Sequence, residues 1–244
     1  MQRRVLIATL AYSGQITSLT AQSVDQAKEE GRDNGWEVRW MILNGTADIA
    51  DMRNQALGLF LNTPCDDLLF VDADVSWSPG TFAHIMRHDV DVVAGLYRER
   101  TDGRVKYPWL QQGSMIENPV SGLPLLEAEA VPAGFLRLKR DGVEKLAGQY
   151  DTRWIQDDAK LKGICYPFLF DWTWNGNRRL SEDYTYCHRW RAIGGQVWVD
   201  PALKLDHIGQ KVFVGDFMGH LHNEAMAQVS SLDPKAMAEA ALAL

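Results

Sequence analysis

Leu68-Leu69-Phe70-Val71-Asp72-Ala73-Asp74 joins four apolar residues directly to two aspartates that are separated by one alanine. A short, continuous apolar run of this kind is typical of a strand that is buried on both faces of a parallel sheet. In such sheets, ligands bind at the carboxyl ends of the strands. The sequence therefore predicts a pair of carboxylates, Asp72 and Asp74, at the ligand-binding edge of an α/β sheet.

Strand and helix patterns alternate on both sides of this segment. Continuous apolar runs predict further strands at 5–10, 36–43 and 90–96. Apolar residues at helical spacing predict helices at 18–31, 48–62 and 78–88. The second helix begins with Asp48 as its N-cap, and the third with Ser78 before Pro79. This alternation predicts an α/β domain with a mostly parallel, doubly wound sheet and helices on both faces.

After residue 100 the alternation ends. Prolines, glycines and short apolar pieces over 101–130 predict hairpins rather than another helical crossover. Later patterns predict strands at 131–138 and 196–199, an aromatic loop at 166–179, and helices at 141–147, at 181–194 and in the tail from Pro234. We therefore expect a small antiparallel, hairpin-containing region beside the parallel core.

Composition argues against several classes of function. The chain of 244 residues suffices for one well-buried domain, and its formal net charge of -7 gives no global attraction for nucleic acid or a membrane surface. Its three cysteines have no close pair spacing, which argues against a zinc module. The first apolar run is too short for a secretory signal, and no run approaches the roughly 20 apolar residues of a membrane span. We expect a cytoplasmic protein with reduced thiols.

Asp72 and Asp74 are candidate ligands of a hard divalent cation. With one residue between them, a turn after the strand can direct both carboxylates at one ion. Mg²⁺ and Mn²⁺ prefer oxygen ligands and accept phosphate oxygens in the same shell. Such a cation would neutralise a diphosphate leaving group. The alternative is an ordinary strand-ending turn with two solvated aspartates.

Several segments around this pair resemble one known superfamily. Ala50-Asp51-Met52-Arg53-Asn54 precedes the strand that ends at Asp72, Trp77-Ser78-Pro79 follows it, and Asp91-Val92-Val93-Ala94-Gly95 lies in the next predicted strand. Together with Val131-Pro132-Ala133-Gly134-Phe135 and Ser181-Glu182-Asp183-Tyr184, these segments resemble the GT-A-fold glycosyltransferases over roughly residues 3–210. The resemblance implies a Rossmann-like GT-A fold, a nucleoside diphosphate sugar as donor, and Mn²⁺ or Mg²⁺ as cofactor.

The resemblance also implies roles for single residues. Arg53 would approach the donor diphosphate, for which its guanidinium fork is suited, and Tyr12 could stack on the nucleotide base. The implied nucleotide-sugar contacts are Thr9, Ala11, Tyr12, Arg53, Asp72 and Gly134. The implied metal ligands are Asp72, Asp74 and His207. Plainer interpretations stay open: the segment 9–12 could be an ordinary turn after a strand, Arg53 an exposed cation on a helix, and His207 a polar surface residue.

Glu182 and Asp183 follow Ser181 at the start of a predicted helix. A serine cap with acids in the first turn stabilises a helix through its dipole. By resemblance to inverting GT-A enzymes, one of these carboxylates would take the proton of the acceptor hydroxyl, with Asp183 preferred as base and Glu182 as the alternative. Both interpretations can hold together.

The aromatic loop before this helix is a candidate acceptor site. Trp172, Trp174 and Arg178 could orient an acceptor, although a hydrophobic plug over the core is an equal alternative. The acceptor class stays open among a saccharide, a protein, a lipid head group and a modified DNA base. A basic cluster at 98–106 could contact phosphate on such an acceptor. His220 and His222 could share a strand face or lie in a surface loop.

We expect one catalytic domain at 1–210, with a donor half at about 1–100 and an acceptor half at about 101–210, and a C-terminal extension at 211–244 that packs on it. The predicted function is a metal-dependent glycosyltransferase of the inverting type, with a retaining mechanism still open. A nucleotidyltransferase and a catalytically inactive nucleotide-sugar binder are the alternatives. The first strand is not followed by Gly-x-Gly-x-x-Gly, which argues against a dehydrogenase.

Overall fold

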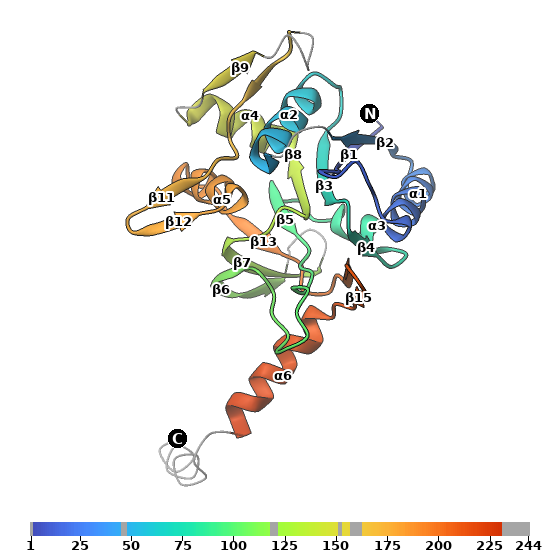
Figure 1. Cartoon of the computed structure of the whole chain (residues 1–244), viewed down its shortest axis with the longest axis vertical. Coiled ribbons are helices and arrows are strands. Elements are labelled where there is room, and N and C mark those ends of the chain that lie inside the picture. Colours follow the sequence, from blue (N-terminus) through green and yellow to red (C-terminus); the bar gives the residue numbers. More distant parts are fainter. Residues whose placement is uncertain (1, 45–47, 118–121, 151–152, 157–162, 231–244) are drawn as a thin grey trace.

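The computed structural model describes residues 2–44, 48–117, 122–150, 153–156 and 163–230 of the chain. Its centre is one large sheet, built from β1 (Arg4–Leu10), β2 (Glu37–Leu43), β3 (Asp67–Asp72), β5 (Val92–Ala94), β6 (Leu110–Glu117), β7 (Pro124–Ala130), β8 (Phe135–Lys139) and β13 (Val197–Val199). These eight strands lie in the order β2-β1-β3-β8-β5-β13-β7-β6. Figure 1 shows how the sheet runs through the middle of the molecule.

The sheet is mixed, with a parallel part and an antiparallel part. β1 is parallel to both β2 and β3, and β13 is parallel to β5. β8 lies antiparallel between β3 and β5, so that Leu136 is opposite Phe70 on one side and Ala94 on the other. β7 and β6 form an antiparallel edge. The predicted α/β class with its hairpin region is confirmed, although the insertion of β8 into the centre was not predicted.

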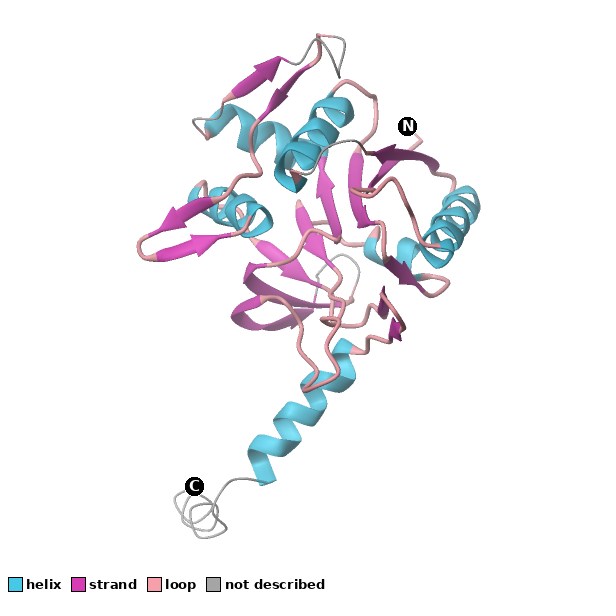
Figure 2. Ribbon diagram, viewed as in Figure 1, coloured by secondary structure: helices cyan, strands magenta, loops and turns pink. Residues whose placement is uncertain are grey.

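Helices cover both faces of the sheet, as the sequence predicts. They are α1 (Ser18–Asp33), α2 (Ile49–Leu61), α3 (Thr81–Ile85), α4 (Arg140–Gln149) and α5 (Glu182–Ala192). In β1, Leu6 and Ala8 pack in the core beneath α2, α4 and α5, whereas Val5 and Ile7 pack in the core beneath α1 and α3. Because successive residues of a strand face opposite sides, a strand between two helix layers must be apolar throughout. Figure 2 shows helices on the two sides of the strands.

The predicted start of the third helix is wrong. Asp48 does cap α2, since its carboxylate accepts from the backbone N–H of Ala50 at 2.9 Å. α3, however, begins at Thr81 after Gly80, which has a left-handed φ of 85°, and Ser78 is not its cap. The carboxylate of Glu30 on α1 accepts from the N–H groups of Gly80 and Ala83 instead, at 2.6 and 2.8 Å. A tertiary contact therefore supplies the cap, and the helix ends at Ile85 rather than near residue 88.

Three small sheets surround the central one. β4 (Val75–Trp77), β14 (Leu205–Ile208) and β15 (Val212–Phe213) form one of them, in the order β15-β14-β4. The others are the pairs β9 (Trp154–Gln156) with β10 (Cys165–Pro167), and β11 (Thr173–Asn175) with β12 (Arg178–Leu180). The predicted aromatic loop thus contains a hairpin. The pairing of β14 with β4 sets His207 opposite Val75, next to Asp74.

The C-terminal described element is α6 (Phe217–Ser230), which extends away from the sheet (Figure 1). His220 and His222 therefore lie on a helix, and both the strand and the loop interpretations are wrong. Phe217 is buried, with ring centroids 4.8 Å from Tyr107 and 5.3 Å from Trp109. The helix predicted from Pro234 lies outside the described residues. Within the described ranges, no helix combines the length and the apolar character needed to cross a membrane.

Candidate active site

A cleft of about 660 Å³ opens at the carboxyl ends of β1 and β3. It is the edge at which parallel sheets bind ligands. Six residues that the sequence singles out line this cleft, namely Tyr12, Arg53, Asp72, Asp74, Glu182 and Asp183. They come from the segment after β1, from α2, from the end of β3 and from the start of α5, so only the tertiary fold brings them together.

Arg53 lines the cleft from α2 and is almost fully buried. Its side chain is 3% exposed, and the guanidinium donates to Asp72 Oδ1 at 3.2 Å and to Glu182 Oε1 at 3.3 Å. A third hydrogen bond goes to the carbonyl of Ala133 at 3.2 Å. Burial disfavours the charged guanidinium, but the charges of Asp72 and Glu182 outweigh it and raise the pKa of Arg53. This arginine joins carboxylates that are far apart in the sequence.

Asp72 is held in place from three sides. Its backbone N–H donates to the carbonyl of Gly134 at 2.9 Å, and its carboxylate accepts from Arg53 and, at 3.4 Å, from the hydroxyl of Tyr97. A Cβ at Gly134 would lie 2.2 Å from the Tyr97 hydroxyl oxygen, so glycine is needed at this close approach. Tyr97 was not predicted, because a single tyrosine after a strand carries no signal of its own. Burial raises the pKa of Tyr97 well above its ordinary value, so its hydroxyl acts as a donor.

Asp74 lies between a histidine and an arginine. Its Oδ1 is 3.7 Å from Nε2 of His207, and its Oδ2 accepts from Arg100 at 2.8 Å. Burial would raise the pKa of Asp74, but the neighbouring His207 and Arg100 outweigh it and lower the pKa. Nδ1 of His207 is 3.0 Å from the carbonyl of Arg98. A carbonyl can only accept, so Nδ1 of His207 is the donor in this contact, and Nε2 is the ring atom that faces Asp74.

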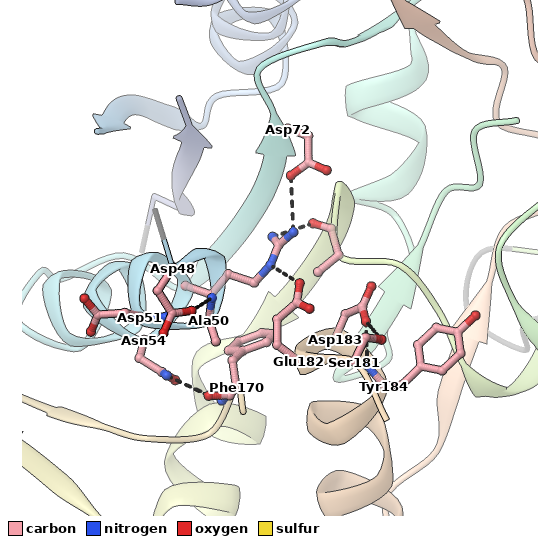
Figure 3. Close-up of polar contacts among 12 residues, drawn as sticks. Asp48, Ala50, Asp51, Asn54, Asp72, Phe170, Ser181, Glu182, Asp183 and Tyr184 are labelled. Atoms are coloured by element: carbon pink, nitrogen blue, oxygen red, sulfur yellow. Dashed lines mark hydrogen bonds and ion pairs between the residues drawn. The ribbon is translucent and has the colours of Figure 1, made fainter. Parts of the chain in front are cut away.

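Glu182 and Asp183 lie side by side at the start of α5, across the cleft from Asp72 (Figure 3). Ser181 is the N-cap residue, but its side chain makes no capping hydrogen bond and donates to the Asp183 carboxylate instead. The same carboxylate oxygen accepts from the N–H of Tyr184 at 2.8 Å. Burial raises the pKa of Asp183 despite these hydrogen bonds, and burial together with the charge of Asp183 raises the pKa of Glu182. Both carboxyls are therefore more basic than usual.

Asn54, beside Arg53 on α2, fixes the chain that leads to α5. It is buried, its amide donates to the carbonyl of Phe170 at 2.8 Å, and its oxygen accepts from the N–H groups of Leu169 and Phe170 at 2.9 Å. Phe170 also packs 5.9 Å from the Arg53 guanidinium. The sequence marks Asn54 only through the resemblance of its segment, and its clamping role depends on a partner 116 residues away.

Other predicted residues lie outside the lining of the cleft. Thr9 is buried and its hydroxyl accepts from the indole N–H of Trp40 at 2.9 Å, and Ala11 is buried as well. The predicted acceptor residues Trp172, Trp174 and Arg178 lie on or beside the β11–β12 hairpin, where Trp174 is 69% exposed. Whether these residues contact a ligand stays a prediction.

Among the described residues, one group of three side chains brings metal-ligating atoms within 4.8 Å of one another. That group is His84, His88 and Asp200 rather than the predicted set of Asp72, Asp74 and His207. In the predicted set, arginines contact both aspartates. A Mg²⁺-type ion is commonly held by one or two carboxylates together with substrate phosphates, so a preassembled set of three ligands is not a requirement.

Comparison with known proteins gives a relationship at the level of fold. No protein-family model matches the sequence, and no curated protein matches it. A197 from STIV superposes with a TM-score of 0.52 and 19% identity, over 86% of this chain and 93% of that chain. GalNAc-T7, solved with UDP, GalNAc and Mn²⁺, gives a TM-score of 0.49 and 12% identity, over 85% of this chain and 44% of that chain. The catalytic domain of Drosophila β1,4-galactosyltransferase 7 gives a TM-score of 0.44 and 13% identity, over 81% of this chain and 65% of that chain. The similarity to A197 shows a shared fold.

Proposed function

We propose that this chain is a metal-dependent glycosyltransferase of the GT-A type, which moves a sugar from a nucleoside diphosphate sugar to an acceptor hydroxyl. The observation that carries the proposal is the convergence of Asp72, Asp74 and Asp183 on one cleft of about 660 Å³. Pockets of roughly 300–1,000 Å³ are usual for small-molecule and cofactor ligands. The cleft is therefore large enough for a nucleotide sugar and carries the carboxylates that the reaction needs.

The nucleotide is proposed to lie along the segment that follows β1. Tyr12 lines the cleft and is 65% exposed, so a base can stack on its ring. Thr9 and Ala11 are buried, and their proposed role is to shape the floor below the nucleotide. Gly134 would leave the space that the Asp72 carboxylate needs beside the diphosphate.

Asp74 and His207 are the proposed ligands of a Mn²⁺ or Mg²⁺ ion, with Asp72 completing the acidic pair. The two atoms that face each other, Oδ1 of Asp74 and Nε2 of His207, are 3.7 Å apart. Two ligand atoms bound to one ion lie roughly 3 Å apart, so a small movement of the two side chains would let both atoms bind the same ion. The Arg98 carbonyl accepts from Nδ1 of His207 and so orients the ring, as backbone carbonyls commonly do for histidines that bind metals. Bound there, the ion would supply Lewis-acid neutralisation of the diphosphate leaving group.

Two arginines would assist this neutralisation from the protein side. Arg100 contacts Asp74 and is exposed, so its guanidinium can also reach phosphate oxygens. Arg53 is engaged by two carboxylates, and we propose that it holds Asp72 toward the diphosphate while contributing its own charge.

Asp183 is the proposed base of an inverting transfer. One of its oxygens accepts from Ser181 and Tyr184, and the other has no hydrogen-bond donor among the described residues. That second oxygen can take the proton of the acceptor hydroxyl, and the raised pKa of Asp183 favours this transfer. Glu182 is the weaker candidate because Arg53 already pairs with it. Product anomeric configuration, measured by NMR, separates inversion from retention.

The acceptor is proposed to approach over the β11–β12 hairpin. Trp172 and Trp174 are exposed on it, and Arg178 lies beside Glu129 at 3.7 Å. Exposed indole faces suit sugar rings or bases. The net charge of -7 favours a saccharide, protein or lipid head group over DNA.

Release of nucleoside diphosphate tests the proposal. The chain is incubated with a panel of uridine, guanosine, cytidine and thymidine diphosphate sugars, with Mn²⁺ or with a chelator, and the released diphosphate is measured. We expect Mn²⁺-dependent release that Asp74→Ala abolishes and that the exposed control Asp25→Ala retains. Metal-independent release that Asp74→Ala leaves unchanged would remove the metal role. Pyrophosphate release from a nucleoside triphosphate would favour a nucleotidyltransferase instead, and binding without turnover would favour an inactive binder.

A further inference from the structure

Two histidines and one aspartate meet at the far end of α3, outside the cleft lining. His84 lies on α3, His88 four positions later, and Asp200 directly after β13. Nε2 of His88 and Oδ2 of Asp200 form a hydrogen bond of 2.6 Å, and Nε2 of His84 is 2.8 Å from the same oxygen. Two imidazoles therefore converge on one carboxylate oxygen.

A hydrogen bond does not explain the contact of His84. Its Nε2 is buried and has no hydrogen-bond partner among the described residues, although the Asp200 oxygen is close. The approach is too oblique for an N–H group to point at the oxygen. Atoms that bind one cation point at the ion and not at each other, so the oblique contact of His84 is the one expected in a metal site, and a bound ion would replace the hydrogen bond between His88 and Asp200. Ligand atoms around one ion lie roughly 3 Å apart, so the distances from the two Nε2 atoms to Oδ2 of Asp200 would need to widen only slightly.

The surrounding structure holds the ligands in position. Asp200 is fully buried, its N–H donates to the Ala94 carbonyl at 2.9 Å, and its Oδ1 accepts from the N–H of Ala202 at 2.9 Å. These bonds leave Oδ2 directed at the two rings. The backbone of His88 is fixed by Arg137, which donates to its carbonyl at 2.7 Å. A buried carboxylate is costly unless cationic or hydrogen-bonding groups compensate it.

We propose that His84, His88 and Asp200 bind one divalent transition-metal ion of the zinc type, at a site separate from the cleft. Two imidazole nitrogens and one carboxylate oxygen form a ligand set that suits Zn²⁺, whereas the cleft set of Asp72, Asp74 and His207 has two carboxylates and one imidazole and, with phosphate oxygens, suits Mn²⁺ or Mg²⁺. The side chain of His84 is 26% exposed, whereas its Nε2 and the side chains of His88 and Asp200 are buried, so the three ligand atoms lie just beneath the surface.

The position of this site defines its effect. The ion would join the segment 75–88, which begins directly after Asp74, to the segment 200–208, which carries His207. β4 and β14 already pair these two segments. The metal would add a second cross-link between the two segments that flank the cleft, and because it binds the folded state it would stabilise that state.

Titration of the metal-free full chain with Zn²⁺ alone tests the site. We expect one equivalent bound, a rise in Tm, and visible Co²⁺ bands typical of nitrogen and oxygen ligands when Co²⁺ replaces Zn²⁺. His84→Ala should weaken Zn²⁺ binding by more than the roughly 10–100-fold that is usual when a residue that only orients a metal ligand is lost. His84→Gln, which keeps more of the side-chain volume, should do the same if His84→Ala does not fold. His222→Ala, an exposed histidine on α6, and Asp74→Ala are the matched controls and should bind as the parent does.

Two results would overturn the proposal. Absence of stoichiometric Zn²⁺ binding by the parent chain would mean that His84, His88 and Asp200 form only a polar cluster. Binding that Asp74→Ala removes but the His84 variants retain would assign the ion to the cleft. Neither result bears on the release of nucleoside diphosphate, so the two proposals fail independently.

Discussion

Replacing Arg53 by methionine should destabilise the protein strongly, by an amount that depends on pH. Methionine keeps an apolar contact with Phe70 but removes the hydrogen bonds to Asp72, Glu182 and the Ala133 carbonyl. Removing one partner of a buried ion pair costs about 3–5 kcal/mol. Most of this cost comes from Glu182, whose side chain is 8% exposed and would keep a buried charge without a partner. Asp72 is partly exposed, so water can solvate its carboxylate in place of Arg53. We expect about 3 kcal/mol, which lowers Tm by roughly 6–12 °C in a chain of this length.

The pH dependence follows from Glu182. Burial and the charge of Asp183 already raise the pKa of Glu182 above its ordinary value of 4.5. A carboxyl with a raised folded-state pKa binds its proton more tightly when folded, so stability decreases as pH rises from the unfolded-state pKa through the folded-state pKa. Loss of Arg53 raises the folded-state pKa further. The additional destabilisation should therefore be small near pH 5 and larger at pH 8.

Equilibrium unfolding in urea at both pH values measures the effect. Glu182→Gln added to Arg53→Met removes the unpaired charge and should restore part of the free energy of unfolding at pH 8. Arg140→Met is the control, because the Arg140 guanidinium donates to the carbonyls of Phe60 and Cys65 and its carboxylate partner, Glu144, is exposed, so its loss should depend little on pH. An equal loss for Arg53→Met at both pH values, with no recovery from Glu182→Gln, would refute the assignment of Arg53 as the counter-ion of Glu182.

Three further predictions concern the cleft and the hairpin. Gly134→Ala places a Cβ 2.2 Å from the Tyr97 hydroxyl, so the free energy of unfolding should fall by about 1–3 kcal/mol, whereas Gly148→Ala, with nothing within 4 Å, should not lower it; equal Tm values for the two variants would contradict this. Because the pKa of Asp183 is raised, kcat/KM should increase with pH around a midpoint above the ordinary carboxyl pKa near 4. A midpoint at or below that ordinary value speaks against Asp183 as the base. Trp174→Ala should raise the acceptor KM roughly 2–10-fold and leave donor hydrolysis unchanged, and an unchanged acceptor KM would exclude stacking there.

Local patterns predict the parallel half of the fold well. β1, β2 and β3 and the helices α1 and α2 match their predicted segments, because an apolar run between two helix layers and an N-cap at Asp48 are properties of neighbouring residues. The same holds for the position of Asp72 and Asp74, which follows from the end of one strand. The antiparallel insertion of β8 had no such signal, since pairing across a sheet depends on residues distant in the sequence.

The candidate site divides in the same way. The sequence alone determined which carboxylates end a strand and which begin a helix, because both features are local. Only the tertiary structure decided that Arg53 contacts both Asp72 and Glu182, the latter 129 positions from Arg53 in the sequence. It also decided that Tyr97 contacts the Asp72 carboxylate, and that Glu30 rather than Ser78 caps α3. Burial and charge pairing are set by what the whole chain packs around a group, and the amino-acid pattern near that group does not contain this information.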